Sequence, residues 1–243
     1  MSSKKFVRSE MLPLKWCDGC GINSFFYMTA DVFEELEKEG KNFVVVSGIG
    51  CTGRVAAHFD LDSVHGLHGR AIPLAVGVKQ GNPKLDVVII SGDGDLLEIG
   101  LGHFVHSARR NDNITVICNS NEVFGMTGGQ VSPTTRLGAK TITTPQGNLK
   151  EPLNVQDILF SNKNYFYART SHIFPQHFKD VLKQAINHEG FSFVEVISPC
   201  VINFSRRLGK GVSDVITDLR SEYKIIETGE KLGEGELGVY KND

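Results

Sequence analysis

The chain alternates between short apolar runs and longer segments in which apolar residues recur every three or four positions. The short runs are rich in β-branched residues and are followed by Gly, Asp, Asn or Ser, which is typical of buried parallel strands. We predict strands at Phe43–Ser47, Val87–Ser91, Ile114–Cys118 and Phe193–Ile197. We predict helices at Asn23–Lys38, Ala71–Gln80, Leu97–Arg109 and Pro175–His188. This alternation indicates right-handed βαβ units and an α/β fold, with a doubly wound, mainly parallel sheet and helices on both faces.

The composition is that of a globular protein without a charge bias. The 243 residues, 40% hydrophobic and 22% charged with a formal net charge of -2, are enough for one sizeable α/β domain. A nucleic-acid or membrane partner would favour a clustered basic excess, so we expect small molecules and proteins as partners. No apolar run approaches a membrane span, which takes about 20 residues. Met1–Glu10 lacks the apolar core of a signal peptide, so we expect a cytoplasmic protein.

The end of the chain differs in pattern from the rest. From Ser205 onward the residues are charged and weakly patterned. We therefore expect residues 1–204 to form the domain. Residues 205–243 are expected to form a C-terminal arm that packs on a partner subunit and is not a core element.

The run Gly92-Asp93-Gly94-Asp95 closes the second predicted strand, and Asn121 follows the third. Ligands gather at the carboxyl ends of strands in such sheets. Magnesium prefers oxygen ligands, which Asp93, Asn121, the Val123 carbonyl and a bound diphosphate would supply. The glycines permit close backbone approach, and the N-terminus of the next helix favours phosphate. A simple turn explains the triplet but not Asn121, so the spacing predicts a magnesium site for thiamine diphosphate.

The chain after Asn121 is rich in Gly and Thr. Backbone N–H groups of this loop and the Thr127 hydroxyl are suited to wrap the phosphates of the cofactor. An irregular surface loop would explain the glycines but not their place after Asn121. The whole segment from Phe124 to Leu153 is expected to be a long, ordered, functional loop.

Four of the five cysteines form a pattern. Cys17 and Cys20 make a Cys-x-x-Cys turn, whereas Cys51 and Cys200 each follow a predicted strand. Intracellular thiols stay reduced, so metal binding explains them better than a disulfide framework. The pair alone fits a redox dithiol or half of a zinc site, but one pair with two single cysteines favours a 4Fe-4S cluster. Cys118 lies inside an apolar strand and is expected to be a small buried hydrophobe.

The run His65-Gly66-Leu67-His68-Gly69-Arg70 precedes an apolar helix. His and Arg side chains beside a phosphate donate to diphosphate oxygens or steer an anionic substrate. The alternative is a polar turn that caps the helix, which is the better explanation for His65. For His68 and Arg70 the two explanations carry equal weight. We take His68 as the candidate catalytic residue.

Together these motifs resemble a known family. In chain order they are WCDGCG, IGC, HGLHGRAIPLAVGVK, SGDGDLLEIGLGHFVHSARRN, NEVFGMTGGQVSPTT and SPCV, from Trp16 to Asn203. They resemble the beta subunit of 2-oxoacid:ferredoxin oxidoreductases, and most closely its 2-oxoglutarate branch. The combination of a thiamine motif with four separated cysteines is specific to few thiamine enzymes. The resemblance implies the thiamine diphosphate-binding fold, with a domain of the diphosphate-holding (PP) type.

The resemblance also implies three sets of site residues. One 4Fe-4S cluster would be bound by Cys17, Cys20, Cys51 and Cys200. Magnesium would be held by Asp93, Asn121 and the Val123 carbonyl. Thiamine diphosphate would be lined by Ile49, Gly50, Cys51, Thr52, His68, Gly94, Asp95, Gly125 and Met126.

The implied activity is oxidative decarboxylation of a 2-oxoacid with coenzyme A, with electrons passing through the cluster to ferredoxin. Gly128-Gly129 resembles the 2-oxoglutarate branch, since broader-specificity archaeal relatives have Lys in place of Gly128. We favour 2-oxoglutarate, which gives succinyl-CoA and CO2, while pyruvate and branched-chain 2-oxoacids stay open. The carboxylate that activates the aminopyrimidine would lie on an alpha subunit with pyrimidine-binding and gamma-like domains.

Two other functions fit part of the pattern. One is a thiamine-dependent decarboxylase or synthase half-subunit in which the four cysteines bind structural zinc. The other is a non-catalytic assembly or sensing protein that keeps the fold and the cluster.

Overall fold

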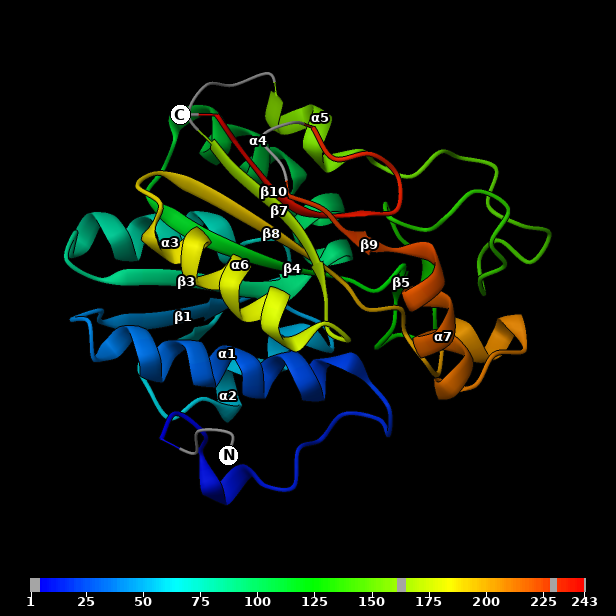
Figure 1. The fold of residues 1–243 in the computed structure, drawn as a ribbon, viewed down its shortest axis with the longest axis horizontal. Coiled ribbons are helices and arrows are strands. Elements are labelled where there is room, and N and C mark those ends of the chain that lie inside the picture. Colours follow the sequence, from blue (N-terminus) through cyan, green and yellow to red (C-terminus); the bar gives the residue numbers. More distant parts are fainter. Residues whose placement is uncertain (1–4, 161–164, 228–230, 243) are drawn as a thin grey trace.

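An eight-stranded sheet forms the centre of the computed structural model, which describes residues 5–160, 165–227 and 231–242 (Figure 1). The strand order is β2-β1-β3-β4-β8-β7-β10-β9, and β5 and β6 form a separate small hairpin. The bounds are β1 Phe43–Ser47, β2 Ser63–His65, β3 Asp86–Gly92, β4 Ile114–Ser120, β5 Val123–Phe124, β6 Gln130–Val131, β7 Tyr165–Ser171, β8 Phe191–Ile197, β9 Lys224–Ile225 and β10 Glu236–Asn242.

Neighbouring strands are parallel throughout the part of the sheet with the order β2-β1-β3-β4-β8-β7. Every residue of β4 and β8 is buried, as expected for parallel strands that helices cover on both faces. Ile117 packs with one helix layer, and the next residue, Cys118, packs with the other. Cys118 is fully buried, which confirms its expected role as a small hydrophobe.

Helices cover the two faces of the sheet in the manner expected of a doubly wound fold. Figure 1 looks onto the face covered by α1 and α6. That face carries α1 Gly21–Glu37, α2 Val55–His58 and α6 Pro175–Asn187. The other face carries α3 Ala71–Gly81, α4 Leu101–Arg110 and α5 Val155–Phe160. In the part of the chain that the structure describes, no helix combines the length and the apolar character that crossing a membrane would require.

The remaining helical segments lie outside these two layers or at their edges. They are α7 Val212–Glu222 and the short turns η1 Ser9–Met11, η2 Thr52–Arg54, η3 Gly94–Ile99 and η4 Ser205–Leu208. The helix expected at Leu97–Arg109 is two elements, because the π-helical η3 begins directly after Asp93 and ends at Ile99, and α4 begins at Leu101, with Gly100 between them. A Cβ at Gly100 would lie 2.7 Å from the Asp95 carbonyl oxygen, so glycine permits this tight junction.

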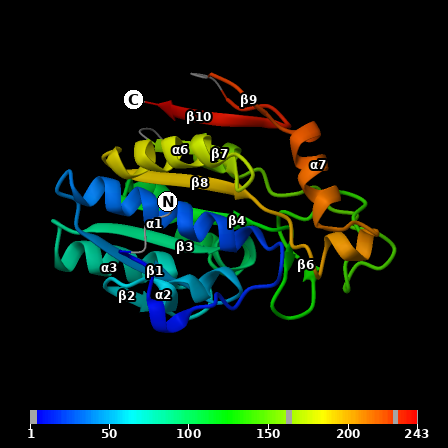
Figure 2. The same ribbon diagram turned by 60° about the horizontal axis from the view of Figure 1, so that its bottom comes forward.

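The C-terminal segment contributes to the sheet. Strand β10 pairs with β7 in antiparallel fashion, with Val239 opposite Ala168. Leu237 is fully buried, and it packs with Val215 and Leu219 of α7. The expectation that residues 205–243 are an arm outside the core is therefore wrong for β10 and α7. Contact of this segment with a partner subunit stays a prediction. Figure 2 shows β9 and β10 at one end of the sheet, opposite β2, with α7 beyond the ends of the strands.

This packing predicts a large loss of stability when Leu237 is shortened. The substitution Leu237→Ala removes buried methyl groups and should lower the free energy of unfolding by about 2–5 kcal/mol. The matched control is Ile225→Ala, since Ile225 pairs with Leu237 across the strands but is 49% exposed. The control should change the free energy of unfolding by less than about 0.5 kcal/mol. Urea denaturation measures both, and equal effects would place β10 outside the cooperative core.

Candidate functional site

Asp93 lies directly after β3 and is buried, with 1% of its surface exposed. Its Oδ2 accepts hydrogen bonds from the Glu122 N–H (3.2 Å), the Ser132 hydroxyl (2.8 Å) and the Thr134 hydroxyl. Its Oδ1 accepts one bond, from the Gly94 N–H (2.9 Å). Burial raises the pKa of Asp93 to about 6, against the effect of these donors. One oxygen is thus fixed by the protein, and the other has a lone pair for a cation, which would favour the charged carboxylate.

Asn121 lies beside Asp93 at the same edge of the sheet. Gly92 at the end of β3 is opposite Asn119 near the end of β4, so the two strands deliver Asp93 and Asn121 together. The Asn121 side chain is buried, and its Oδ1 accepts one hydrogen bond, from the Val123 N–H (3.3 Å). A carboxylate and an amide oxygen at one edge are ligands that fit a hard divalent cation.

Asp95 connects three segments around the same edge. Its Oδ1 accepts hydrogen bonds from the Ile49 N–H (3.1 Å), the Gly69 N–H (2.7 Å) and His68 Nδ1 (2.6 Å). Its Oδ2 accepts a bond from the Ser91 hydroxyl (2.8 Å). Because an ionised carboxylate only accepts, His68 carries the proton on Nδ1 in this contact, which leaves Nε2 for another partner. Asp95 therefore holds the loop of Ile49 and orients His68.

Two glycines allow these segments to approach closely. A Cβ at Gly48 would lie 1.8 Å from Asp95 Oδ2, and one at Gly94 would lie 2.4 Å from the Phe124 ring. The His68 ring meets the Phe124 ring edge to face, with 6.3 Å between the centroids. The loops after β1, β2, β3 and β4 therefore converge on one small region, as the sequence predicts.

Asn119 is a residue of this region that the sequence reasoning missed. It is buried at the end of β4, and its Nδ2 donates to the Thr52 hydroxyl oxygen (2.9 Å). Its Oδ1 is buried and has no hydrogen-bond partner in the described structure. Because Thr52 accepts from Asn119, its own proton is available to another acceptor, such as a phosphate oxygen. An unsatisfied buried oxygen beside an available hydroxyl fits a site that a polar ligand completes. A second Asn at the strand end was the signal in the sequence.

The structure brings the four expected cysteines together. The pKa of the Cys20 thiol is raised to about 12, mainly by burial and to a smaller extent by the nearby Cys200, Cys51 and Cys17. Burial, and then the nearby Cys200 and Cys17, also raise the pKa of Cys51. The indole N–H of Trp16 donates to the Cys51 carbonyl (2.7 Å) and fixes the loop that carries this cysteine. The four thiols are thus close enough for their charges to interact.

The spacing of these thiols bears on the metal that they suit. Within residues 5–160, 165–227 and 231–242, no three or more His, Cys, Asp or Glu side chains are placed to hold one metal ion. Zinc takes each sulfur at about 2.3 Å, so its sulfurs lie within about 4 Å of one another. A 4Fe-4S cluster binds its thiolates through separate irons and takes a wider quartet. The choice between a cluster and a zinc ion at these cysteines stays a prediction.

The metal loop and the cysteine loop are joined. The Cys200 N–H donates to the Asn121 carbonyl (3.1 Å). A Cβ at Gly125 would lie 3.4 Å from Cys200 Sγ. Asn203, which the sequence reasoning missed, donates from its N–H to Cys200 Sγ (3.4 Å) and from its side chain to the Gly125 carbonyl (2.8 Å). The two candidate sites therefore share one wall.

Two residues expected at the cofactor lie at the surface of the loop. Met126 is 47% exposed. The hydroxyl of Thr127 is exposed and donates to the Gln130 side-chain oxygen (2.5 Å), so its proton is already used within the loop. Their contact with the cofactor stays a prediction.

The polar residues before α3 have different roles from those that the sequence predicts. His65 lies in β2 and its Nδ1 pairs with the Ser47 hydroxyl (2.9 Å), so the helix-capping role expected for it is wrong. Arg70 occupies the N-cap position of α3, but its side chain makes no capping bond there; it donates to the Gly69 carbonyl (3.2 Å). His68 is the member of this run that faces the site.

Comparison with known proteins places this geometry in a family. A family described as "Thiamine pyrophosphate enzyme, C-terminal TPP binding domain" matches residues 48–196. The 2-oxoglutarate synthase subunit KorB of Methanothermobacter thermautotrophicus is 40% identical over 210 residues, which are 84% of this chain and 71% of the relative. KorB of Methanocaldococcus jannaschii is 36% identical over 234 residues, which are 96% and 87% of the two chains. The chain belongs to this family of 2-oxoacid:ferredoxin oxidoreductase beta subunits.

Two further relatives extend the comparison. The 2-oxoacid:ferredoxin oxidoreductase subunit beta of Saccharolobus solfataricus is 42% identical over 187 residues, which are 76% of this chain and 61% of the relative. The solved structure of 2-oxoglutarate:ferredoxin oxidoreductase from Magnetococcus marinus, with 2-oxoglutarate, coenzyme A and succinyl-CoA bound, superimposes with a TM-score of 0.87 at 30% identity. That match covers all of this chain and 86% of the other. The resemblance inferred from the motifs and the doubly wound α/β fold are both confirmed.

Membership of the family also identifies one cofactor. Its domain is defined by thiamine pyrophosphate binding, and the matched residues 48–196 contain Asp93, Asp95 and Asn121. Cys17 and Cys200 lie outside the matched residues. Cys20 also lies outside the matched residues, whereas Cys51 lies within them.

The four bonds to Asp95 predict that its charge is needed for the site to hold together. In Asp95→Asn, an NH2 group replaces an accepting oxygen, so facing donors lose their partner. We expect the free energy of unfolding to fall by about 2–3 kcal/mol, measured by urea denaturation. The control is Asp218→Asn, which alters a partly exposed pair with Lys210 and should cost less than about 1 kcal/mol. Equal stabilities of the two variants would contradict the anchoring role.

Proposed function

We propose that this chain is the beta subunit of a 2-oxoglutarate:ferredoxin oxidoreductase. The reaction is oxidative decarboxylation of 2-oxoglutarate with coenzyme A to succinyl-CoA and CO2, with electrons passing through a 4Fe-4S cluster to ferredoxin. The observation that carries the proposal is the shared wall of the two sites, where the Cys200 N–H donates to the Asn121 carbonyl (3.1 Å). A metal-diphosphate loop bonded directly to a cysteine quartet suits a cofactor that produces electrons beside a centre that removes them.

In this proposal the chain holds magnesium through Asp93, Asn121 and the Val123 carbonyl. Support comes from the Oδ1 of Asp93 and the Oδ1 of Asn121, which each accept one protein hydrogen bond and face the same edge. Thiamine diphosphate supplies an electron sink for decarboxylation when it is bound. The chain's own part is to fix the diphosphate, to exclude water with the packed loops, and to present Nε2 of His68 toward the cofactor or the substrate.

We assign the cluster to Cys17, Cys20, Cys51 and Cys200. The proximity of these cysteines supports the assignment, since Cys200, Cys51 and Cys17 all contribute to the raised pKa of Cys20. We also propose a cytoplasmic location, where thiols stay reduced and are available to bind metal.

The substrate assignment rests on two observations. KorB subunits named as 2-oxoglutarate synthases align over most of this chain, and the Gly128-Gly129 pair resembles the 2-oxoglutarate branch of the family. A relative named only as a 2-oxoacid:ferredoxin oxidoreductase is equally similar, so pyruvate and branched-chain 2-oxoacids are the alternative substrates. The alpha subunit supplies the carboxylate that activates the aminopyrimidine.

The activity is tested with the assembly purified without oxygen. We expect about four iron atoms per chain, as for one 4Fe-4S cluster, and reduction of a viologen dye with 2-oxoglutarate and coenzyme A. A colourless protein with stoichiometric zinc would refute the cluster. Faster turnover of pyruvate or a branched-chain 2-oxoacid would overturn the substrate, and turnover of none of them would favour the sensing protein.

Crossed substitutions test whether the two sites are distinct. Asp93→Ala should weaken magnesium-dependent binding of thiamine diphosphate by at least about 10-fold and leave the visible absorbance of the cluster intact. Cys200→Ser should deplete the cluster but keep cofactor binding, because the bond to Asn121 uses the backbone N–H. Calorimetry and iron analysis measure the two effects. Unchanged cofactor affinity in Asp93→Ala, or a full cluster in Cys200→Ser, would remove that residue from its site.

A further inference from the structure

Glu122, between Asn121 and Val123, has an unusual backbone conformation. Its φ is +68°, in the left-handed region that costs a residue with a Cβ about 1–2 kcal/mol. This conformation directs the Glu122 N–H to Asp93 Oδ2 (3.2 Å), while the Glu122 carbonyl accepts from the Thr135 hydroxyl (2.6 Å). The strained peptide thus helps to fix the proposed magnesium ligands. Because its conformation is costly, other contacts must stabilise it.

Arg136 holds the side chain of Glu122. Its Nε lies 2.9 and 2.8 Å from the two carboxylate oxygens, and its Nη2 lies 2.7 Å from Oε1. Glu122 is only 5% exposed, so this carboxylate is held by a planar fork of donors in a largely desolvated place. Such a contact fixes orientation as well as charge.

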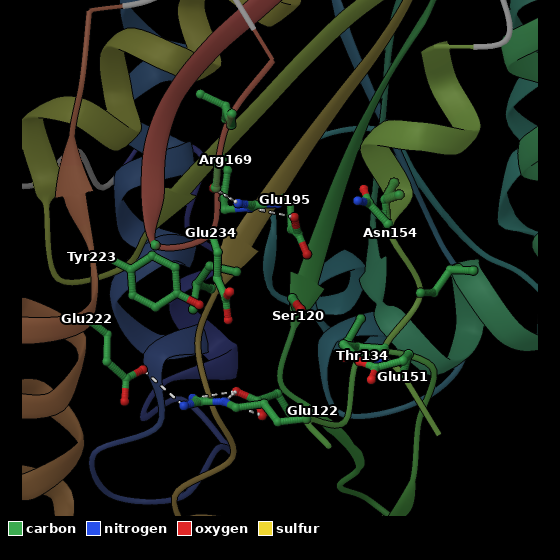
Figure 3. Close-up of a pocket in the computed structure, with 18 residues that line it drawn as sticks. Ser120, Glu122, Thr134, Glu151, Asn154, Arg169, Glu195, Glu222, Tyr223 and Glu234 are labelled. Atoms are coloured by element: carbon green, nitrogen blue, oxygen red, sulfur yellow. Dashed lines mark hydrogen bonds and ion pairs between the residues drawn. The ribbon is translucent and has the colours of Figure 1, made fainter. Parts of the chain in front are cut away.

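The other side of Arg136 is tied to the C-terminal segment. Its NH1 donates to Glu222 Oε2 (3.0 Å), at the last residue of α7. Glu122, Arg136 and Glu222 all line a cleft of about 860 Å³. The dashed lines at Glu222 and at Glu122 in Figure 3 mark their contacts with the Arg136 guanidinium, which lies between the two carboxylates. Because Val215 and Leu219 anchor α7 in the core, the guanidinium is held from both sides.

We propose that Arg136 is a positioning residue, which acts through Glu122 to keep the left-handed peptide in the shape that binds the metal-diphosphate group. The inference rests on the proposed magnesium site of Asp93 and Asn121. It gives the C-terminal segment a role in the site, since α7 orients Arg136 through Glu222.

The substitution Arg136→Met keeps an apolar stem and removes the fork. We expect the dissociation constant for thiamine diphosphate at fixed Mg2+ to rise about 10-fold to 100-fold, the usual effect of removing a group that orients metal ligands. Isothermal calorimetry on the assembly measures it. The matched control is Arg110→Met, which breaks an Arg–Asp112 pair of similar exposure at the end of α4 and should leave the constant unchanged.

Substitutions at Glu122 separate positioning from general stability. Glycine adopts a positive φ without strain, so Glu122→Gly should bind the cofactor better than Glu122→Ala. In the Glu122→Gly background, Arg136→Met should add no further loss, because the side chain through which Arg136 acts is gone. Arg136→Lys keeps the positive charge without the planar fork, so its dissociation constant for thiamine diphosphate should lie between those of the unsubstituted assembly and Arg136→Met. This variant also replaces Arg136→Met in the test if Arg136→Met does not fold.

Two results would overturn the inference. One is an unchanged dissociation constant in both Arg136→Met and Arg136→Lys. The other is an equal loss from Arg136→Met with and without Glu122→Gly. These measurements record binding, so failure of the unsubstituted assembly to turn over 2-oxoglutarate would refute the proposed function and leave the positioning role standing.

Discussion

The hydrogen bond from the Cys200 N–H to the Asn121 carbonyl is the contact on which the rest of the site depends. It exists because β4 and β8 are parallel neighbours in register, with Ser120 opposite Ile197. Both strands end at the same edge of the sheet, so the loops that follow them lie side by side. One turn carries the ligands proposed for magnesium, and the other carries a cysteine of the quartet.

The two acidic residues after β3 show how the environment gives different roles to the same side chain. Asp93 has one oxygen saturated by protein donors, while the other accepts a single backbone bond. Both carboxylate oxygens of Asp95 accept hydrogen bonds from protein donors, and these bonds hold the surrounding loops together. The Asp93 carboxylate is therefore suited to bind a metal ion, and the Asp95 carboxylate is suited to stabilise the loops of the site.

Much of the site was predictable because the chemistry limits which residue types serve. Binding of a hard cation would limit the residue types that can serve at Asp93 and Asn121, and thiolate ligation would limit the four ligand positions to cysteine. An almost wholly apolar run marks β1, whose bounds Phe43–Ser47 are those that the sequence predicts. These constraints act locally in the chain, so they leave a readable pattern.

The missed features depend on contacts between distant segments. Strand β7 was overlooked because Arg169 interrupts its apolar run, and only the fold shows that Glu195 of β8 pairs with it (3.1 Å). Strand β10 offers few apolar residues and gains its burial from β7 and α7. Ser132, Thr134 and Arg136 are ordinary loop residues until the chain places them against Asp93 and Glu122. No local pattern distinguishes such residues.

The central claim is that the cofactor edge and the cysteine quartet work as one electron-transfer unit. The most direct measurement is electron paramagnetic resonance of the complete assembly, frozen after 2-oxoglutarate is added in the absence of ferredoxin or dye. The account predicts the signal of a reduced 4Fe-4S cluster within the first turnover. Release of CO2 from 2-oxoglutarate without any such signal would contradict it.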